Sequence, residues 1–167
     1  MPQRKLCREP AAGGPCVLRV NATDELFFPH VDSCMAITFL MSSGAMLGGH
    51  VPMQWGANAP LYPLGNARRI IQEMSNQAAG ETIVGLISLC DLSASLDGVN
   101  PAWPLDAIYL NVPIQGVPHL ILDARGAAHG VDLSVNSQTK MVRAVRCGET
   151  GGGTVRWFNG LNGKVMV

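Results

Sequence analysis

Apolar residues follow two distinct patterns along the chain, and each pattern predicts a different kind of element. Within residues 64–79, apolar side chains recur at the helical period with charged and amide side chains between them: Ala67, Ile70, Ile71 and Met74. This spacing predicts a helix with one polar face, which Gly80 ends. Residues 82–89 are apolar without polar alternation, which is typical of an interior strand.

Short β-branched runs separated by turn residues dominate the second half of the chain, and one further run stands near the start. The predicted strands are residues 16–21, 107–112, 118–123, 131–135, 141–146 and 155–158, with hairpin turns at 123–126, 136–138 and 159–163. Together with two or three helices, these strands predict an α/β fold built as a mixed β-sheet sandwich.

The length of 167 residues fits one domain with a substantial core. Residues 1–15 are rich in Pro, Gly and charge, so we expect a flexible N-terminal segment ahead of a single α/β domain at 16–167. Residues 22–32 are predicted to form a loop with polar side chains that leads to Cys34.

Cys34 lies where this loop is predicted to become a helix. Asp32 and Ser33 precede it, and these residue types cap helix N-termini because their side-chain oxygens accept from unpaired backbone N–H groups. A thiol at the positive end of the helix dipole would have a lowered pKa, which favours the nucleophilic thiolate. Cys34 is therefore the candidate nucleophile.

His50 follows a second apolar piece, after the breaker cluster Ser42-Ser43-Gly44. Gly48 and Gly49 remove side-chain bulk just before it, which indicates a strand that another group approaches closely. Such a strand beside the Cys34 segment would bring imidazole to thiol. A Cys–His pair is the smallest set of groups that supports acyl transfer through a covalent intermediate.

Composition narrows the class of protein. The 12 basic and 12 acidic residues give a formal net charge of zero, and no basic stripe typical of a nucleic-acid binder is present. No apolar run reaches the length of a membrane span, and the N-terminus has no apolar core of a Sec signal peptide. We expect either a cytoplasmic protein or an effector secreted or injected by a dedicated machine.

The five cysteines have wide, irregular spacings and include no Cys-x-x-Cys pair. This argues against structural zinc or a disulfide scaffold and favours reduced thiols. Cys16, Cys90 and Cys147 have apolar surroundings and are expected in the core. A metal site from His30, Cys34 and His50 matches no common zinc pattern.

The segments Asp-Ser-Cys-Met-Ala-Ile and Leu-Gly-Gly-His-Val-Pro-Met resemble the CheD chemoreceptor glutamine deamidases and the related catalytic domain of cytotoxic necrotizing factor. The resemblance covers roughly residues 16–92, and its specific parts are the Cys and His segments. It implies a deamidase architecture, Cys34 as the nucleophile and His50 as the general base. A backbone carbonyl, Asn21 or Thr23 would orient the histidine, and Thr23 is the named candidate.

Two departures from the chemoreceptor deamidases argue against a chemoreceptor substrate. Phe28 stands six positions before the cysteine, where those enzymes have an orienting threonine, and Cys-Asp-Leu-Ser-Ala-Ser replaces a later glycine-rich segment. The toxin-like branch tolerates the first departure, because a backbone carbonyl can orient its histidine. The resemblance therefore implies a bacterial toxin or effector that modifies a host or rival protein.

The expected activity is hydrolysis of a glutamine, or asparagine, side-chain carboxamide through a thioester, without a cofactor. Transglutamination would follow if an amine replaced water. A papain-like peptidase is an alternative, drawing its base from His119 or His129, and His30 is a rival base close to Cys34. A non-catalytic protein-binding module is the alternative outside the enzymes.

Overall fold

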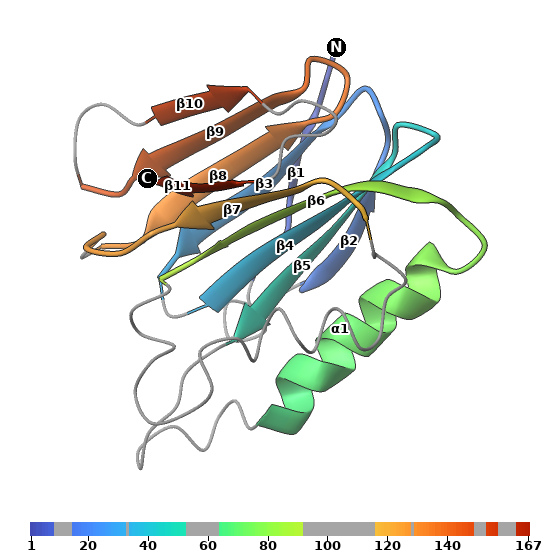
Figure 1. The fold of residues 1–167 in the computed structure, drawn as a ribbon, viewed down its shortest axis with the longest axis horizontal. Coiled ribbons are helices and arrows are strands. Elements are labelled where there is room, and N and C mark those ends of the chain that lie inside the picture. The colour runs from blue at the N-terminus through green and yellow to red at the C-terminus, as the bar shows by residue number, and fades with distance from the viewer. Residues whose placement is uncertain are drawn as a thin grey trace.

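The protein is described here from a computed structural model, which describes residues 1–8, 15–32, 34–52, 64–91, 116–127, 129–148, 153–156 and 163–167. Two β-sheets stack face to face, and one helix, α1 (Leu64–Ala78), lies along the outer side of one of them (Figure 1). This arrangement confirms the mixed α/β sandwich predicted from the sequence. The described residues contain one helix, where two or three were predicted for the whole chain.

The five-stranded sheet is antiparallel except at one edge. Its strands, in spatial order, are β1 (Arg4–Leu6), β3 (Glu25–Val31), β8 (Val131–Asn136), β9 (Met141–Arg146) and β10 (Gly153–Arg156). Only β1 and β3 pair in parallel among these described strands.

The six-stranded sheet carries Cys34 and His50, the candidate nucleophile and general base. Its strands, in spatial order, are β11 (Gly163–Met166), β7 (His119–Asp123), β6 (Ile83–Cys90), β4 (Cys34–Met41), β5 (Met46–Pro52) and β2 (Val17–Val20). The β11–β7 and β7–β6 pairs are parallel, and the remaining pairs are antiparallel. The sheet is therefore mixed.

Two hydrophobic cores lie on opposite faces of the six-stranded sheet. The core between the sheets includes Leu26, Phe28, Ala36, Leu89 and Leu133. The core between the sheet and α1 includes Ile37, Phe39, Leu47, Ile71 and Met74. Because side chains alternate along a strand, β4 supplies residues to both cores and all eight of its residues are buried.

Gly48 and Gly49 allow side chains from both cores to approach β5. A Cβ at Gly48 would lie 2.8 Å from the Leu26 methyl carbons, on the side of the five-stranded sheet. A Cβ at Gly49 would overlap the sulfur of Met74, on the side of α1. The prediction that another group approaches the backbone closely before His50 is confirmed.

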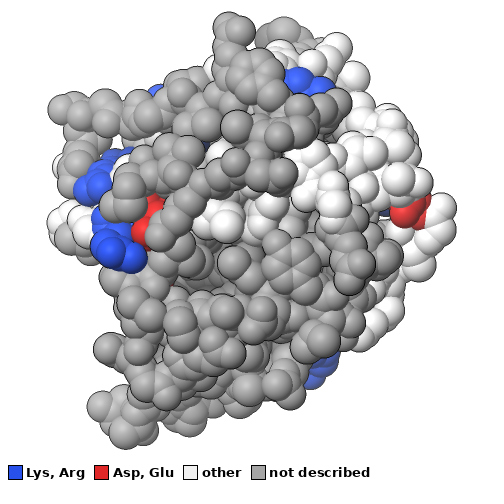
Figure 2. Space-filling view, in the orientation of Figure 1, with Lys and Arg blue, Asp and Glu red and all other residues white. Residues whose placement is uncertain are grey.

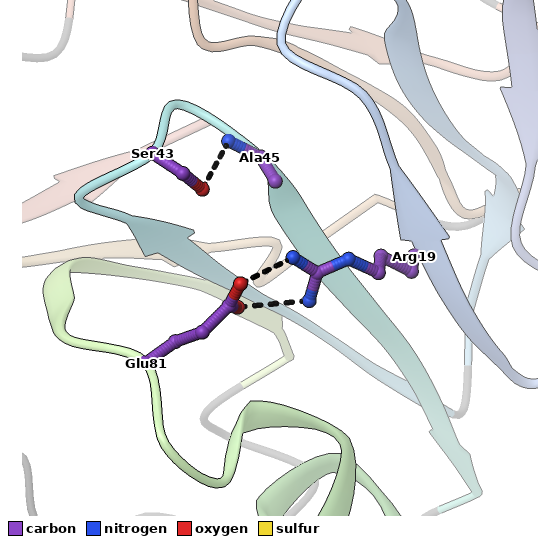
Figure 3. Close-up of polar contacts among 4 residues, drawn as sticks. All are labelled: Arg19, Ser43, Ala45 and Glu81. Carbon is purple, nitrogen blue, oxygen red and sulfur yellow. Dashed lines mark hydrogen bonds and ion pairs between the residues drawn. The ribbon is translucent and has the colours of Figure 1, made fainter.

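An ion pair links the segment that follows α1 to β2, the edge strand of the six-stranded sheet. The guanidinium of Arg19 on β2 donates two hydrogen bonds to the Glu81 carboxylate, at 2.8 and 2.5 Å (Figure 3). These bonds lower the pKa of Glu81 and raise that of Arg19. Nearby, the Ala45 amide donates to the Ser43 hydroxyl in the turn between β4 and β5 (Figure 3).

Several sequence predictions about local structure are confirmed. The helix at 64–79 is α1, and the strands predicted at 16–21, 82–89, 118–123, 131–135 and 141–146 correspond to β2, β6, β7, β8 and β9. The strand predicted at 155–158 overlaps β10, and the hairpin at 136–138 joins the antiparallel strands β8 and β9. The strand predicted at 107–112 lies outside the described residues.

Other predictions are wrong. Residues 22–32 are not only loop, because β3 runs through them with Leu26 and Phe28 buried. The N-terminal segment is not flexible throughout, because β1 pairs with β3 and Cys7 is fully buried. The turn at 123–126 does not close a hairpin, since β7 and β8 belong to different sheets. The turn predicted at 159–163 lies mostly outside the described residues, and the strands on either side of it, β10 and β11, also belong to different sheets.

Charged side chains are scattered on the face drawn in Figure 2. The described Lys and Arg side chains form small separate groups, interrupted by Asp and Glu (Figure 2). No helix among the described residues combines the length and the apolar character that a bilayer span requires.

Candidate active site

Cys34 is the first residue of a strand. It begins β4, and the helix predicted to start here is wrong. The physical reason is burial on both sides: residues 35–41 alternate between two cores, so a continuous apolar run is compatible with a central strand. The helix-dipole argument for a lowered thiol pKa at Cys34 therefore fails, and Asp32 is an exposed residue after β3 instead of a cap.

His50 lies on the neighbouring strand β5, as predicted. The register of β4 and β5 pairs His50 with Ala36 and Cys34 with Pro52. Opposite residues in antiparallel strands share a face, so Cys34 and His50 both face the five-stranded sheet, on diagonally adjacent positions. Such diagonal positions are separated by roughly 7–8 Å, within reach of an aromatic side chain. The fold therefore brings together the two residues that the sequence singled out.

The imidazole of His50 is held from two sides. Its Nδ1 lies 3.1 Å from the backbone carbonyl oxygen of Cys7, and its ring meets that of Phe28 edge-on, with centroids 6.1 Å apart. Its backbone amide also donates to the Cys16 carbonyl at 2.8 Å. Because a carbonyl oxygen only accepts, the bond to Cys7 assigns the ring proton to Nδ1 and leaves the lone pair on Nε2. This is the tautomer that a general base requires when Nε2 takes the proton.

Both groups of the pair are buried. Cys34 is 5% exposed and His50 is 1% exposed. Cys34 nevertheless stands at the end of its strand, where β4 starts and β5 and β6 finish. The site thus lies at one end of the sandwich, in the layer between the two sheets.

Cys7 is the residue of this site that the sequence did not indicate. It follows β1, its amide donates to the Phe27 carbonyl, and its thiol donates to the Cys16 carbonyl at 3.4 Å. Burial raises the pKa of this thiol far above its ordinary value, so Cys7 stays protonated and is no rival nucleophile. Its contribution is the carbonyl, which any residue type would supply, and no sequence signal could have identified it.

The other cysteines divide by environment. Cys90 is buried in the core beside α1, as expected, whereas Cys16 and Cys147 are only partly buried. Cys147 lies with its sulfur 3.5 Å from the Asp132 carboxylate. Burial, with the nearby negative charge of Asp132, raises the pKa of Cys147, which opposes thiolate formation there.

Thr23 and Asn21 do not reach His50. Both are exposed around the turn between β2 and β3, beside the β2 residues that pair with the start of β5, whereas His50 lies near its end. The assignment of Thr23 as the orienting residue is wrong, because the chain reverses at this turn and carries Thr23 to the opposite end of the strand. Of the predicted alternatives, the structure supports a backbone carbonyl, from Cys7 and not from the loop before Cys34.

The remaining histidines are apart from the pair. His119 opens β7 on the face toward α1, opposite to the face that carries Cys34, so it cannot serve as a base for that thiol. Its Nε2 lies 2.9 Å from the Ser88 hydroxyl, and burial lowers its pKa to about 4. His30 is exposed, with its amide donating to Asp132, and His129 is exposed in the turn before β8.

The described residues hold no group of three or more His, Cys, Asp or Glu side chains placed to bind a metal ion. His30, Cys34 and His50 therefore do not converge as a metal site.

Fold and site together define an α/β sandwich with a thiol and an oriented imidazole on adjacent strands. In comparisons with known proteins, no family model and no curated protein sequence matches the chain.

Proposed function

We propose that the protein is a cysteine-dependent amidohydrolase that deamidates a glutamine, or an asparagine, of another protein. The supporting observation is His50, which is buried on the strand beside Cys34, faces the same layer and has its Nδ1 against a carbonyl. A histidine fixed in one tautomer next to a thiol is the arrangement that activates a cysteine nucleophile.

Each proton in the proposed reaction has a carrier. His50 Nε2 accepts the proton of Cys34, and the thiolate attacks the carboxamide carbon of the substrate. The C–N bond then breaks as imidazolium returns the proton to nitrogen, which releases ammonia and leaves a thioester on Cys34. Water, deprotonated by the same imidazole, hydrolyses the thioester to a carboxylate and restores the thiol.

The thiol environment differs from the one that the sequence suggested. Without a helix at Cys34, activation of the thiol rests on His50, and the oxyanion must be stabilised by groups other than a helix N-terminus. The imidazole is well suited to deprotonate the thiol, since the Cys7 carbonyl stabilises the imidazolium that forms when Nε2 takes the proton.

The Cys7 carbonyl also favours one branch of the resemblance. In the toxin-like deamidases a backbone carbonyl can orient the histidine, whereas the chemoreceptor enzymes use a threonine, which Phe28 replaces here. We infer an effector or toxin whose substrate is a protein of a host or rival cell. The mechanism requires no cofactor, and an amine in place of water would give transglutamination.

A test independent of the substrate is alkylation of Cys34 by iodoacetamide near neutral pH, followed by peptide mass spectrometry. We expect Cys34 to react faster than Cys147, whose pKa is raised, and to slow in His50→Ala because the base is lost. Cys147→Ser is the matched control and should leave the Cys34 rate unchanged. An equal Cys34 rate in wild type and His50→Ala would contradict the proposed pair.

The activity itself is tested by intact-mass spectrometry of candidate target proteins, with ammonia measured in parallel. Deamidation adds about one mass unit per site, and this gain should be lost in Cys34→Ser and His50→Ala but kept in Cys147→Ser. Cleaved backbones would instead indicate a peptidase. A target that is bound equally by wild type and Cys34→Ser, without any mass change, would indicate a binding module.

A further inference from the structure

The outer face of the five-stranded sheet carries a cleft of about 340 Å³ on strands β1, β3, β8 and β9, whose positions are labelled in Figure 1. All of its lining residues except Met141 have polar or charged side chains, whose aliphatic parts also line the cleft: Arg4, Glu25, Ser134, Asn136, Thr139, Met141 and Arg143. This volume lies at the lower end of the roughly 300–1,000 Å³ range of small-ligand sites. A small molecule would fit.

The hollow follows from the lengths of side chains across the sheet. The register places Ser134 between Phe27 on β3 and Arg143 on β9, and it places Asn136 opposite Met141. Short side chains on the middle strand β8 thus form a floor, with long side chains on both flanks. The cleft is built mainly into the regular sheet surface, and Thr139 in the turn between β8 and β9 adds to its lining.

One wall presents a guanidinium in a fixed position. Arg4 stacks over the Phe27 ring, with its guanidinium carbon 4.4 Å from the ring centroid, and its Nε donates to Glu25 at 2.7 Å. These two contacts hold the planar group in one orientation. Its terminal N–H groups make no further hydrogen bond in the part of the chain that the structure describes, so they remain available to a ligand.

The opposite wall presents a second guanidinium, for which the described residues supply no counterion. Arg143 is exposed on β9, and no ion pair or hydrogen bond of its side chain occurs among the described residues. Of the side chains that line the cleft, two are cationic and one, Glu25, is anionic. The floor adds the Ser134 hydroxyl and the amide N–H₂ of Asn136, whose Oδ1 already accepts from the Thr139 amide. The lining is thus dominated by donors and has a positive excess.

We propose that this cleft binds a small phosphate monoester, with the phosphate held between Arg4 and Arg143 over Ser134. Planar guanidinium groups donate paired hydrogen bonds to phosphate oxygens, and hydroxyl and amide donors complete the coordination of a dianion. The rest of the cleft, toward Asn136, Thr139 and Met141, accommodates the organic part. The site lies on the outer face and at the opposite end of β3 from Cys34, so it is independent of the proposed catalytic pair.

The proposal is tested by isothermal titration calorimetry of the full chain with glycerol phosphate, with inorganic phosphate and succinate as comparison anions. Arg143→Gln should weaken binding of glycerol phosphate about tenfold or more, because hydrogen bonds between charged groups are lost. Arg143→Lys keeps the charge but not the paired donors, and should weaken binding by a smaller factor. Arg69→Gln, at an exposed position on α1, removes the same charge elsewhere and should leave binding unchanged.

Three results would overturn the proposal: no saturable binding of glycerol phosphate up to about 10 mM, equal losses in Arg143→Gln and Arg69→Gln, or tighter binding of succinate than of either phosphate. The last result would identify the cleft as a dicarboxylate site. Far-UV circular dichroism of each variant checks that the sheet is intact, so a loss of binding reports on the cleft.

Discussion

Replacing Gly49 by alanine tests the packing of α1 on the six-stranded sheet. A methyl group at this position would overlap the sulfur of Met74 and approach its Cγ and Cε within 3.2 and 3.1 Å. Carbon atoms in good contact are roughly 3.5–4.0 Å apart, so the fully buried Met74 side chain would have to move. Because α1 packs on this face, the displaced atoms have little space to enter.

The expected cost combines two opposing effects. Overpacking a filled core costs about 1–3 kcal/mol, while replacing glycine by alanine within a strand returns about 0.5–1 kcal/mol of backbone entropy. Gly49→Ala should therefore lower the free energy of unfolding by about 1–2 kcal/mol, in contrast to the gain expected at an open strand position. With a urea m-value of about 2 kcal/mol/M, the unfolding midpoint should fall by about 0.5–1 M.

The decisive comparison is made in a Met74→Ala background. Met74→Ala alone should cost about 2–5 kcal/mol, because a fully buried side chain leaves a cavity. With the sulfur gone, Gly49→Ala should be neutral or stabilising, which gives a coupling energy of about 2 kcal/mol between the two positions. Urea unfolding of the four proteins, followed by circular dichroism, measures this term. A coupling below about 0.5 kcal/mol would refute the packing argument.

Two further predictions concern buried polar groups. The pKa of His119 is about 4, below its ordinary 6.5, so its neutral form is favoured by folding. The contribution of neutral His119 to the free energy of unfolding is complete above pH 6.5 and falls by about 3 kcal/mol as the pH drops toward 4. In His119→Gln the free energy of unfolding should fall less over this pH range. Equal falls in wild type and His119→Gln, measured by urea unfolding at each pH, would contradict this prediction. Thr38 is fully buried and its hydroxyl has no hydrogen-bond partner among the described residues, so Thr38→Val should raise the free energy of unfolding by about 1 kcal/mol. A lower unfolding midpoint in this variant would show that the hydroxyl is satisfied.

Periodicity identified elements where one face of the chain is buried. The helix α1 has one polar face and β8 alternates buried and half-buried residues, and both were predicted within a residue or two. Periodicity does not identify β4, because its two faces pack in two different cores and its sequence shows no alternation of apolar and polar residues. The apolar run after Cys34 therefore has the composition of a buried helix as much as of a buried strand. The explanation of an activated thiol by a helix dipole depended on the helix and fails with it.

The candidate site was predictable only where side-chain type carries the information. A thiol at Cys34 and an imidazole at His50, with two glycines before it, are visible in the sequence. The carbonyl of Cys7 is not, since every residue has one and its position depends on β1 pairing with β3. The same pairing shows why a Pro- and Gly-rich N-terminal segment was misjudged: β1 is only three residues long, too short for composition or period to indicate a strand.

The topology of the five-stranded sheet has a consequence for how the protein folds. Its central pairing joins Leu26 of β3 to Val135 of β8, near opposite ends of the chain, whereas β2, β4, β5 and β6 of the other sheet are all complete by Cys90. Contacts between distant parts of a chain slow folding, because loop-closure entropy is lost before the contacts form. During synthesis, β3 emerges long before its partner β8 and has an unpaired edge that can associate with other chains. The second half of the chain therefore completes the five-stranded sheet only after β4 and β5, the strands that carry Cys34 and His50, have been synthesised.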